Sequence, residues 1–356
     1  MNINAQIKAF DQLGRFMSKH TETRNDQDLS KLNEFFHGGY QQAIQQAQAY
    51  NNWFTLPNLT FALDQWGQAL AAENINEWIA KYPETYFAPA SPKTVALITA
   101  GNIPLVGFHD FLSVLISGHN VLVKPSSDDQ QLLPFLAQVL VAINPNFAQR
   151  ITFADGKIQD FDAVIATGSD NSARYFEHYF GKYPHIIRKN RSSVAILTGD
   201  ESDADLQGLA EDIFRYFGLG CRNISKVYLP EDFDVNRIFE ASLPWQHVME
   251  NKSYANNYDY HRAILMMEKQ DFLENGVFTI QENNRWHAPV SMLFYQRYTN
   301  LTEVENEIKA QAEQLQCVAT MAPLNVDTVK LGETQKPGLG DYADHVDTLA
   351  FLGTLG

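Results

Sequence analysis

From Thr94 to Phe180 the chain alternates short runs of apolar and β-branched residues with longer stretches of helical periodicity. The apolar runs cover 94–99, 120–124 and 163–166, and helical patterns follow them at 105–117, 132–143 and 172–180. Short connections between such elements are typical of parallel strands joined by crossover helices. The pattern predicts an α/β fold with a doubly wound, Rossmann-type sheet, in which ligands bind at the carboxyl ends of the strands.

A second alternation follows the apolar run at 193–197. It comprises helical patterns at 204–217 and 303–314 and strand patterns at 226–229, 290–295 and 317–321. Residues 1–85 differ, because they are amphipathic with a helical period throughout. We therefore expect an N-terminal helical segment over 1–90 that packs on a nucleotide-type domain over 91–195, and a second α/β domain over 196–356.

Charge and cysteine usage limit the classes of function. The 356 residues include 42 acidic and 27 basic side chains, a net charge of −15, which argues against nucleic acid and anionic membranes as partners. The most apolar region is interrupted by polar residues, glycine and proline, so we expect no membrane span, and the N-terminus lacks a signal-peptide pattern. Two cysteines in scattered positions predict no disulfide framework, no metal site and a reducing, cytoplasmic location.

Ligand-type loops follow three of the predicted strands. The first carries Gly101 and Asn102. The others are Lys124-Pro125-Ser126-Ser127 and Thr167-Gly168-Ser169. Because parallel strands place their carboxyl ends at one edge of the sheet, we expect these loops to lie together.

Cys221 is the candidate nucleophile. It ends the glycine-rich segment Phe217-Gly-Leu-Gly-Cys221, in which glycine lets the backbone approach a ligand closely. The neighbouring Arg222 favours the thiolate, which is the reactive form of cysteine. Cys317 lies within an apolar strand pattern and is expected to be structural.

Five segments in this order resemble the motifs of the aldehyde dehydrogenase superfamily. They are 100–104, 123–126, 166–169, 217–221 and 287–290. Within that superfamily the chain resembles the acyl-CoA reductase branch, which includes the fatty acid reductase of bacterial luminescence systems. The resemblance covers residues 94–352. It implies an aldehyde dehydrogenase-like fold, with a nicotinamide cofactor domain over 91–195 and a catalytic domain over 196–356.

The resemblance also implies roles for single residues. Cys221 corresponds to the nucleophile, and Asn102 corresponds to the asparagine that donates to the substrate oxyanion. Lys124, in the loop with Pro125, Ser126 and Ser127, corresponds to a lysine that contacts the adenosine ribose. The turn Thr167-Gly168-Ser169 corresponds to the helix start beside the pyrophosphate.

Two departures from the family pattern refine the expectation. Aldehyde-oxidising members carry a glutamate general base where this chain has 188–191, a stretch without a carboxylate. An acyl-enzyme should then survive hydrolysis longer, which favours reduction of an acyl thioester, acyl-CoA foremost, to an aldehyde. A gap in the alignment, or Glu211 or Asp212 acting as the base, is the alternative.

The second departure concerns the cofactor. NAD-preferring members often carry a glutamate at the position of Ser127, so the serine favours NADPH, with Lys124 and Arg150 as candidate partners of a 2′-phosphate. NADH stays open. The alternative functions are an oxidising or CoA-acylating aldehyde dehydrogenase and a non-catalytic acyl- or nucleotide-binding subunit. Family resemblance suggests a homo-oligomer.

Overall fold

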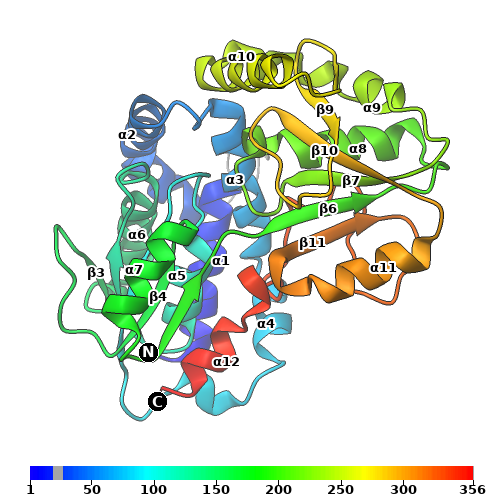
Figure 1. Ribbon diagram of the computed structural model, residues 1–356. Coiled ribbons are helices and arrows are strands. Elements are labelled where there is room, and N and C mark those ends of the chain that lie inside the picture. The colour runs from blue at the N-terminus through cyan, green and yellow to red at the C-terminus, as the bar shows by residue number, and fades with distance from the viewer. Residues whose placement is uncertain (19–26, 356) are drawn as a thin grey trace. The chain divides into compact units, whose positions relative to one another are not determined.

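The computed structural model describes residues 1–18 and 27–355 (Figure 1). They form two compact units, of which unit 1 comprises 1–189 and 338–356 and unit 2 comprises 190–337. The predicted boundary at 195/196 differs from this division by six residues. The C-terminal segment 338–356, expected in the second domain, belongs to unit 1.

Unit 1 is built on a five-stranded parallel sheet in the order β3-β2-β1-β4-β5. Its strands are β1 (Thr94–Ile98), β2 (Asn120–Lys124), β3 (Ile151–Phe153), β4 (Ala163–Thr167) and β5 (His185–Arg188). β2 ends where Pro125 removes a backbone donor. The order 3-2-1-4-5 is that of a Rossmann-type sheet and confirms the predicted fold class.

Helices cover both faces of this sheet. The helices of unit 1 are α1 (Ile3–Met17), α2 (Gln27–Tyr50), α3 (Leu56–Ala69), α4 (Ala72–Ile79), α5 (Phe108–Ile116), α6 (Leu132–Ile143), α7 (Asp170–Phe180) and α12 (Thr348–Gly353). Val95 and Leu97 of β1 lie in one core with residues of α1, α3, α5, α6 and α12. The intervening Ala96 faces α7, where Phe176 and Phe180 cover it. Successive side chains of β1 therefore pack against helices on opposite faces of the sheet, as in a strand that is buried on both sides.

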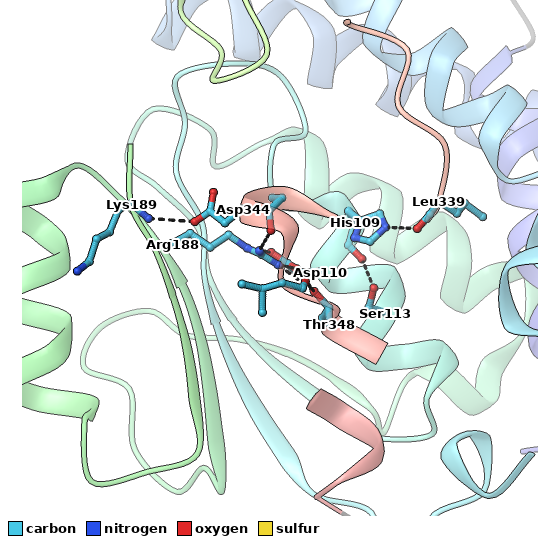
Figure 2. Close-up of polar contacts among 10 residues, drawn as sticks. His109, Asp110, Ser113, Arg188, Lys189, Leu339, Asp344 and Thr348 are labelled. Carbon is cyan, nitrogen blue, oxygen red and sulfur yellow. Dashed lines mark hydrogen bonds and ion pairs between the residues drawn. The ribbon is translucent and has the colours of Figure 1, made fainter. Parts of the chain in front are cut away.

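The C-terminal segment is tied to unit 1 by a buried ion pair (Figure 2). Arg188, at the end of β5, donates to the Asp110 carboxylate of α5 at 2.6 Å and to Thr348 Oγ1 of α12 at 2.9 Å. It also donates to the carbonyl of Ala343. Both charged side chains are buried, so removing either partner would leave an uncompensated charge in the core.

Unit 2 holds a six-stranded sheet in the order β11-β6-β7-β10-β9-β8. Its strands are β6 (Ser192–Ile196), β7 (Ile224–Pro230), β8 (Leu273–Glu274), β9 (Thr279–Glu282), β10 (Met292–Tyr298) and β11 (Leu315–Thr320). All neighbouring strands pair in parallel except β8 with β9, which pair antiparallel at the edge.

The helices of unit 2 are α8 (Asp203–Phe214), α9 (Asn236–Ala241), α10 (Lys252–Met267) and α11 (Leu301–Ala310). α8 begins with a capping box, because the Ser202 side chain accepts from Asp205 N while the Asp205 side chain accepts from Ser202 N. The predicted helix 204–217 extends too far. The chain leaves the helix after Phe214, and Tyr216 and Phe217 adopt left-handed conformations.

Candidate functional site

The three predicted ligand loops of unit 1 share one edge of its sheet. β2, β1 and β4 are adjacent and parallel, and Ile98 at the end of β1 pairs with Lys124 on one side and Ala166 on the other. The loops that follow the three strands therefore leave the sheet side by side. The crevice between β1 and β4 is the switch point at which such sheets bind ligands.

The loops after β1 and β2 are packed against each other. Ser126 N donates to Thr99 Oγ1 at 3.2 Å. A Cβ atom at Gly101 would lie 2.8 Å from Ser126 Oγ and 2.9 Å from Asp128 Cβ, so only glycine fits there. From the segment between α2 and α3, the buried Asn51 donates to the carbonyl of Gly101 at 3.0 Å and to that of Asp128 at 3.4 Å.

A buried carboxyl group also connects the loops after β1 and β2. Asp129, 8% exposed, accepts from the backbone N of Leu105 and of Leu132. Leu105 has φ of 58°, a left-handed conformation that needs such support in a non-glycine residue. Burial raises the pKa of the Asp129 carboxyl to about 6, although the backbone donors oppose this shift.

The predicted cofactor residues fall into two groups by exposure. Lys124, Ser127 and Ser169 are exposed, as is Asn102. Pro125, Ser126, Thr167 and Gly168 are half-buried, because they form the bases of the loops. The roles of these residues in cofactor binding, and of Asn102 at the oxyanion, remain predictions.

The turn after β4 leads directly into α7. Ser169 is the N-cap of that helix, and its side chain accepts from Ser172 N. A Cβ at Gly168 would lie 2.8 Å from Ser172 Cβ and 3.0 Å from Phe176 Cε2, so glycine is required by helix packing at this point. A helix start at the carboxyl end of a central strand suits a phosphate group.

Arg150 does not belong to this edge. It precedes β3 and therefore lies at the amino ends of the strands, away from Lys124 at the carboxyl end of β2. Its guanidinium donates to Gln6 Oε1 and to the carbonyls of Leu115 and His119. The expectation that Arg150 assists a 2′-phosphate is wrong.

Cys221 lies in unit 2, on the loop between α8 and β7. The residue is half-buried. Tyr216, Phe217 and Gly218, with φ of 54°, 59° and 76°, reverse the chain before it. Two consecutive non-glycine residues in this region cost about 1–3 kcal/mol each, a strain found most often at functional sites.

Two residues that the sequence analysis missed fix this loop. Ser193 Oγ of β6 donates to the carbonyl of Cys221 at 2.8 Å. Asn223, 3% exposed, accepts from Gly220 N at 2.8 Å through its side chain. Ser193 is remote in the sequence, and no local pattern indicates its contact with Cys221. Asn223 lies two residues after Cys221 and is a residue type that favours turns.

Cys317 occupies a different environment. It lies in β11, paired with Ser193 of β6, and its Sγ is 3.0 Å from Ser193 Oγ. Burial raises the pKa of the Cys317 thiol to about 11. The thiol is therefore protonated at neutral pH, which is the inert form.

The alternative general bases are engaged in structural contacts. Asp212 is fully buried in α8 and accepts from Gly332 N, Thr334 N and Thr334 Oγ1 at 2.7, 3.1 and 2.7 Å. Glu211 accepts from Arg215 at 2.9 Å. In the stretch predicted to replace the family glutamate, Arg188 is buried against Asp110 and Lys189 N donates to Asp344.

Comparison with known families identifies relatives over most of the chain. A family model described as acyl-CoA reductase (LuxC) matches residues 6–303. A long-chain acyl-protein thioester reductase of Photorhabdus laumondii is 22% identical over 274 residues, which are 70% of this chain and 55% of that protein. One from Aliivibrio fischeri is 22% identical over 240 residues, 61% of this chain and 48% of that protein. The matched region thus spans about half the length of these relatives.

Solved structures share the fold at lower identity. An indole-3-acetaldehyde dehydrogenase of P. syringae superimposes with a TM-score of 0.64 and 14% identity, covering 94% of this chain and 74% of that one. The aldehyde dehydrogenase KauB of Pseudomonas aeruginosa gives 0.63 and 13%, with the same coverage. These similarities show an aldehyde dehydrogenase-like fold, as the sequence predicts. Among the described residues, no helix has the length and apolar character needed to cross a bilayer.

Proposed function

The chain belongs to the acyl-CoA reductase (LuxC) family, and from this premise we propose that it reduces an acyl thioester, foremost acyl-CoA, to an aldehyde through an acyl group bound to Cys221. The observation that carries the proposal is the position of the half-buried Cys221 on a strained, glycine-rich loop, whereas burial raises the pKa of the other cysteine, Cys317. The curated relatives are named acyl-protein thioester reductases, so an acyl group on a carrier protein is the second substrate class.

The proposed reaction begins with attack of the Cys221 thiolate on the thioester carbonyl. The tetrahedral oxyanion takes a hydrogen bond from the Cys221 backbone N–H and, by the family pattern, one from the Asn102 side-chain amide. The carrier thiolate leaves, and an acyl-enzyme remains, which divides one difficult step into two easier ones. A bound nicotinamide would supply the hydride that converts the acyl group to a thiohemiacetal, and its collapse releases the aldehyde and the Cys221 thiolate.

Survival of the acyl-enzyme requires that water is not activated nearby. Asp212 accepts from the backbone N–H groups of Gly332 and Thr334, and Glu211 accepts from Arg215, so both carboxylates weighed as the base are engaged in structural contacts. Proton abstraction from water needs a base within hydrogen-bond reach. These contacts favour transfer of the acyl group between thiols, and its reduction, over its hydrolysis to an acid.

For the cofactor we propose a nicotinamide dinucleotide held at the carboxyl edge of unit 1. The switch point at β1 and β4, the start of α7 at Ser169 and the exposed Lys124 fit an adenosine pyrophosphate. The uncharged Ser127 favours NADPH. NADH is the second candidate, because the exposed carboxylate of Asp128 lies within 3.4 Å of Ser127 Oγ and would repel a 2′-phosphate.

A cytoplasmic location is part of the proposal, because a reducing compartment keeps the Cys221 thiol reduced. We also propose a homo-oligomer, on family resemblance alone.

The direct test is oxidation of NADPH and of NADH against a panel of acyl-CoAs of increasing chain length, with the aldehyde detected as product. Aldehyde formed in proportion to cofactor oxidised supports the proposal. Oxidation of added aldehyde with no reduction of any thioester would instead identify an oxidising dehydrogenase. Neither activity, together with a Cys221 thiol that resists iodoacetamide, would favour a non-catalytic binding subunit.

A further inference from the structure

We propose that Asn223 is the positioning residue of the Cys221 loop, and that it sets both the place of the nucleophile and the direction of the Cys221 backbone N–H. The inference rests on the proposed function, because it assigns Asn223 a role in the chemistry of Cys221. It depends on contacts within unit 2 alone.

The side chain of Asn223 joins the end of α8 to the turn before Cys221. Its Nδ2 donates to the carbonyls of Asp212 and Arg215 at 2.9 and 2.8 Å, and to that of Ile213 at 3.4 Å. The carbonyls of Asp212 and Ile213 belong to the last turn of α8 and that of Arg215 to its C-cap residue, where intrahelical donors run out. Its Oδ1 accepts from Gly220 N at 2.8 Å. One buried amide thus ties the nucleophile turn to the end of a rigid helix.

The backbone of Asn223 orients the peptide group that carries the proposed oxyanion donor. Asn223 N donates to the carbonyl of Gly220 at 3.0 Å. That carbonyl belongs to the same planar peptide unit as the Cys221 N–H, and in a trans peptide the two groups point in opposite directions. Fixing the Gly220 carbonyl therefore fixes the direction of the Cys221 N–H.

These contacts stabilise a strained backbone segment. Tyr216 and Phe217 hold left-handed conformations inside the segment that Asn223 closes, between Arg215 and Gly220. Such residues persist only where the surrounding structure over-determines them. Without the amide, the segment would relax, and the thiol and the peptide N–H would lose their fixed positions together. Ser193 would still hold the Cys221 carbonyl, so the loop would shift without detaching.

The test compares Asn223→Ala with Asn325→Ala, which removes an exposed asparagine that contacts Glu305 in the same unit. Labelled acyl-CoA without reduced cofactor counts the sites that form an acyl-enzyme, and turnover is then expressed per titrated site. A misplacement of about 1 Å can cost about 10²-fold in rate, so we expect kcat per site to fall about 10- to 100-fold in Asn223→Ala. We expect KM for the cofactor to change less than about twofold, and Asn325→Ala to match wild type.

If Asn223 has only a structural role, Asn223→Ala lowers the number of titrated sites and leaves turnover per site unchanged. That outcome overturns the inference. Should Asn223→Ala fail to fold, Asn223→Asp keeps the acceptor for Gly220 N and replaces the donors, and the same loss per site is expected. Loss of the fold in both variants would assign Asn223 to stability and also overturn the inference. If wild type forms no acyl-enzyme at Cys221, the proposed function itself fails.

Discussion

The loops at the carboxyl edge of unit 1 and the Cys221 loop of unit 2 are both fixed by buried polar side chains, but these come from different places. In unit 1 the anchors are Asn51, about 50 residues upstream of the loop it holds, and the titratable Asp129. In unit 2 a neutral amide within the same turn, Asn223, closes the loop. The unit 1 loops follow strands, whereas the Cys221 loop follows a helix and precedes β7.

The difference suggests a division of tasks. The amide of Asn223 and the hydroxyl of Ser193, which hold the Cys221 loop, do not titrate, as suits the proposed nucleophile. The unit 1 loops are joined by the distant Asn51 and by the titratable Asp129 of the loop after β2, and they carry exposed residues, as suits the proposed cofactor.

The two cysteines give the largest expected effect. Cys221→Ser should lower thioester reduction by at least about 10³-fold, because the covalent route is lost. Cys317→Ser should stay within about tenfold of wild type, since burial already keeps that thiol protonated. Steady-state reduction of one acyl-CoA by both variants measures the contrast. Equal losses would remove the distinction between the two sulfur atoms.

Asn102 tests the contribution of unit 1 to the chemistry. Asn102→Ala should lower kcat by about 10²–10³-fold, the usual loss when one oxyanion donor is removed. Binding of the cofactor, followed by quenching of protein fluorescence, should change little. A collapse of cofactor affinity with normal turnover at saturation would make Asn102 a cofactor residue instead.

Asp129 tests the titratable anchor through the pH dependence of stability. Its folded-state pKa of about 6 lies above the usual value of 3.8, so the folded protein binds this proton more tightly than the unfolded chain. The contribution to stability is full below pH 3.8 and is lost as pH rises through 6. The free energy of unfolding of wild type relative to Asp129→Asn should thus fall by about 2 kcal/mol between pH 4.5 and 7.5. Denaturant titrations at both pH values measure this change, and a flat difference would show that Asp129 is not the titrating anchor.

Ser127 gives the smallest expected effect. Ser127→Glu should shift the ratio of kcat/KM for NADPH over NADH about tenfold toward NADH, because a new carboxylate repels a 2′-phosphate by about 1 kcal/mol or more. Ser91→Glu adds the same charge ahead of β1, at the amino ends of the strands, and should leave the ratio unchanged. Equal behaviour of the two variants would place cofactor selection elsewhere.

Elements set by local pattern could be predicted from the sequence. β2 and α6 occupy the predicted ranges 120–124 and 132–143, because an apolar run ends at Pro125 in one case and at Asn144 in the other. The helix predicted to reach Phe217 ends at Phe214, since the apolar period continues through residues whose backbone turns left-handed. The sequence does not predict β3, β5, β8 and β9, because two to four residues carry too little pattern.

Contacts between distant residues set the limit of prediction. The return of residues 338–356 to unit 1 depends on Arg188 meeting Asp110 and Thr348, which no local pattern reveals. The anchors Asn51 and Ser193 are unremarkable in the sequence, and their role comes only from the fold. Motif order indicated Cys221 and the strand-end loops, whereas the side chains that hold them in place required the structure.

The most direct measurement of the central claim is mass spectrometry of the wild-type protein after incubation with an acyl-CoA in the absence of reduced cofactor. We expect one acyl group on the peptide that contains Cys221, labile to hydroxylamine and released as aldehyde when NADPH is added. An acyl group on Cys317, or reduction of the thioester with Cys221 unmodified throughout turnover, would contradict it.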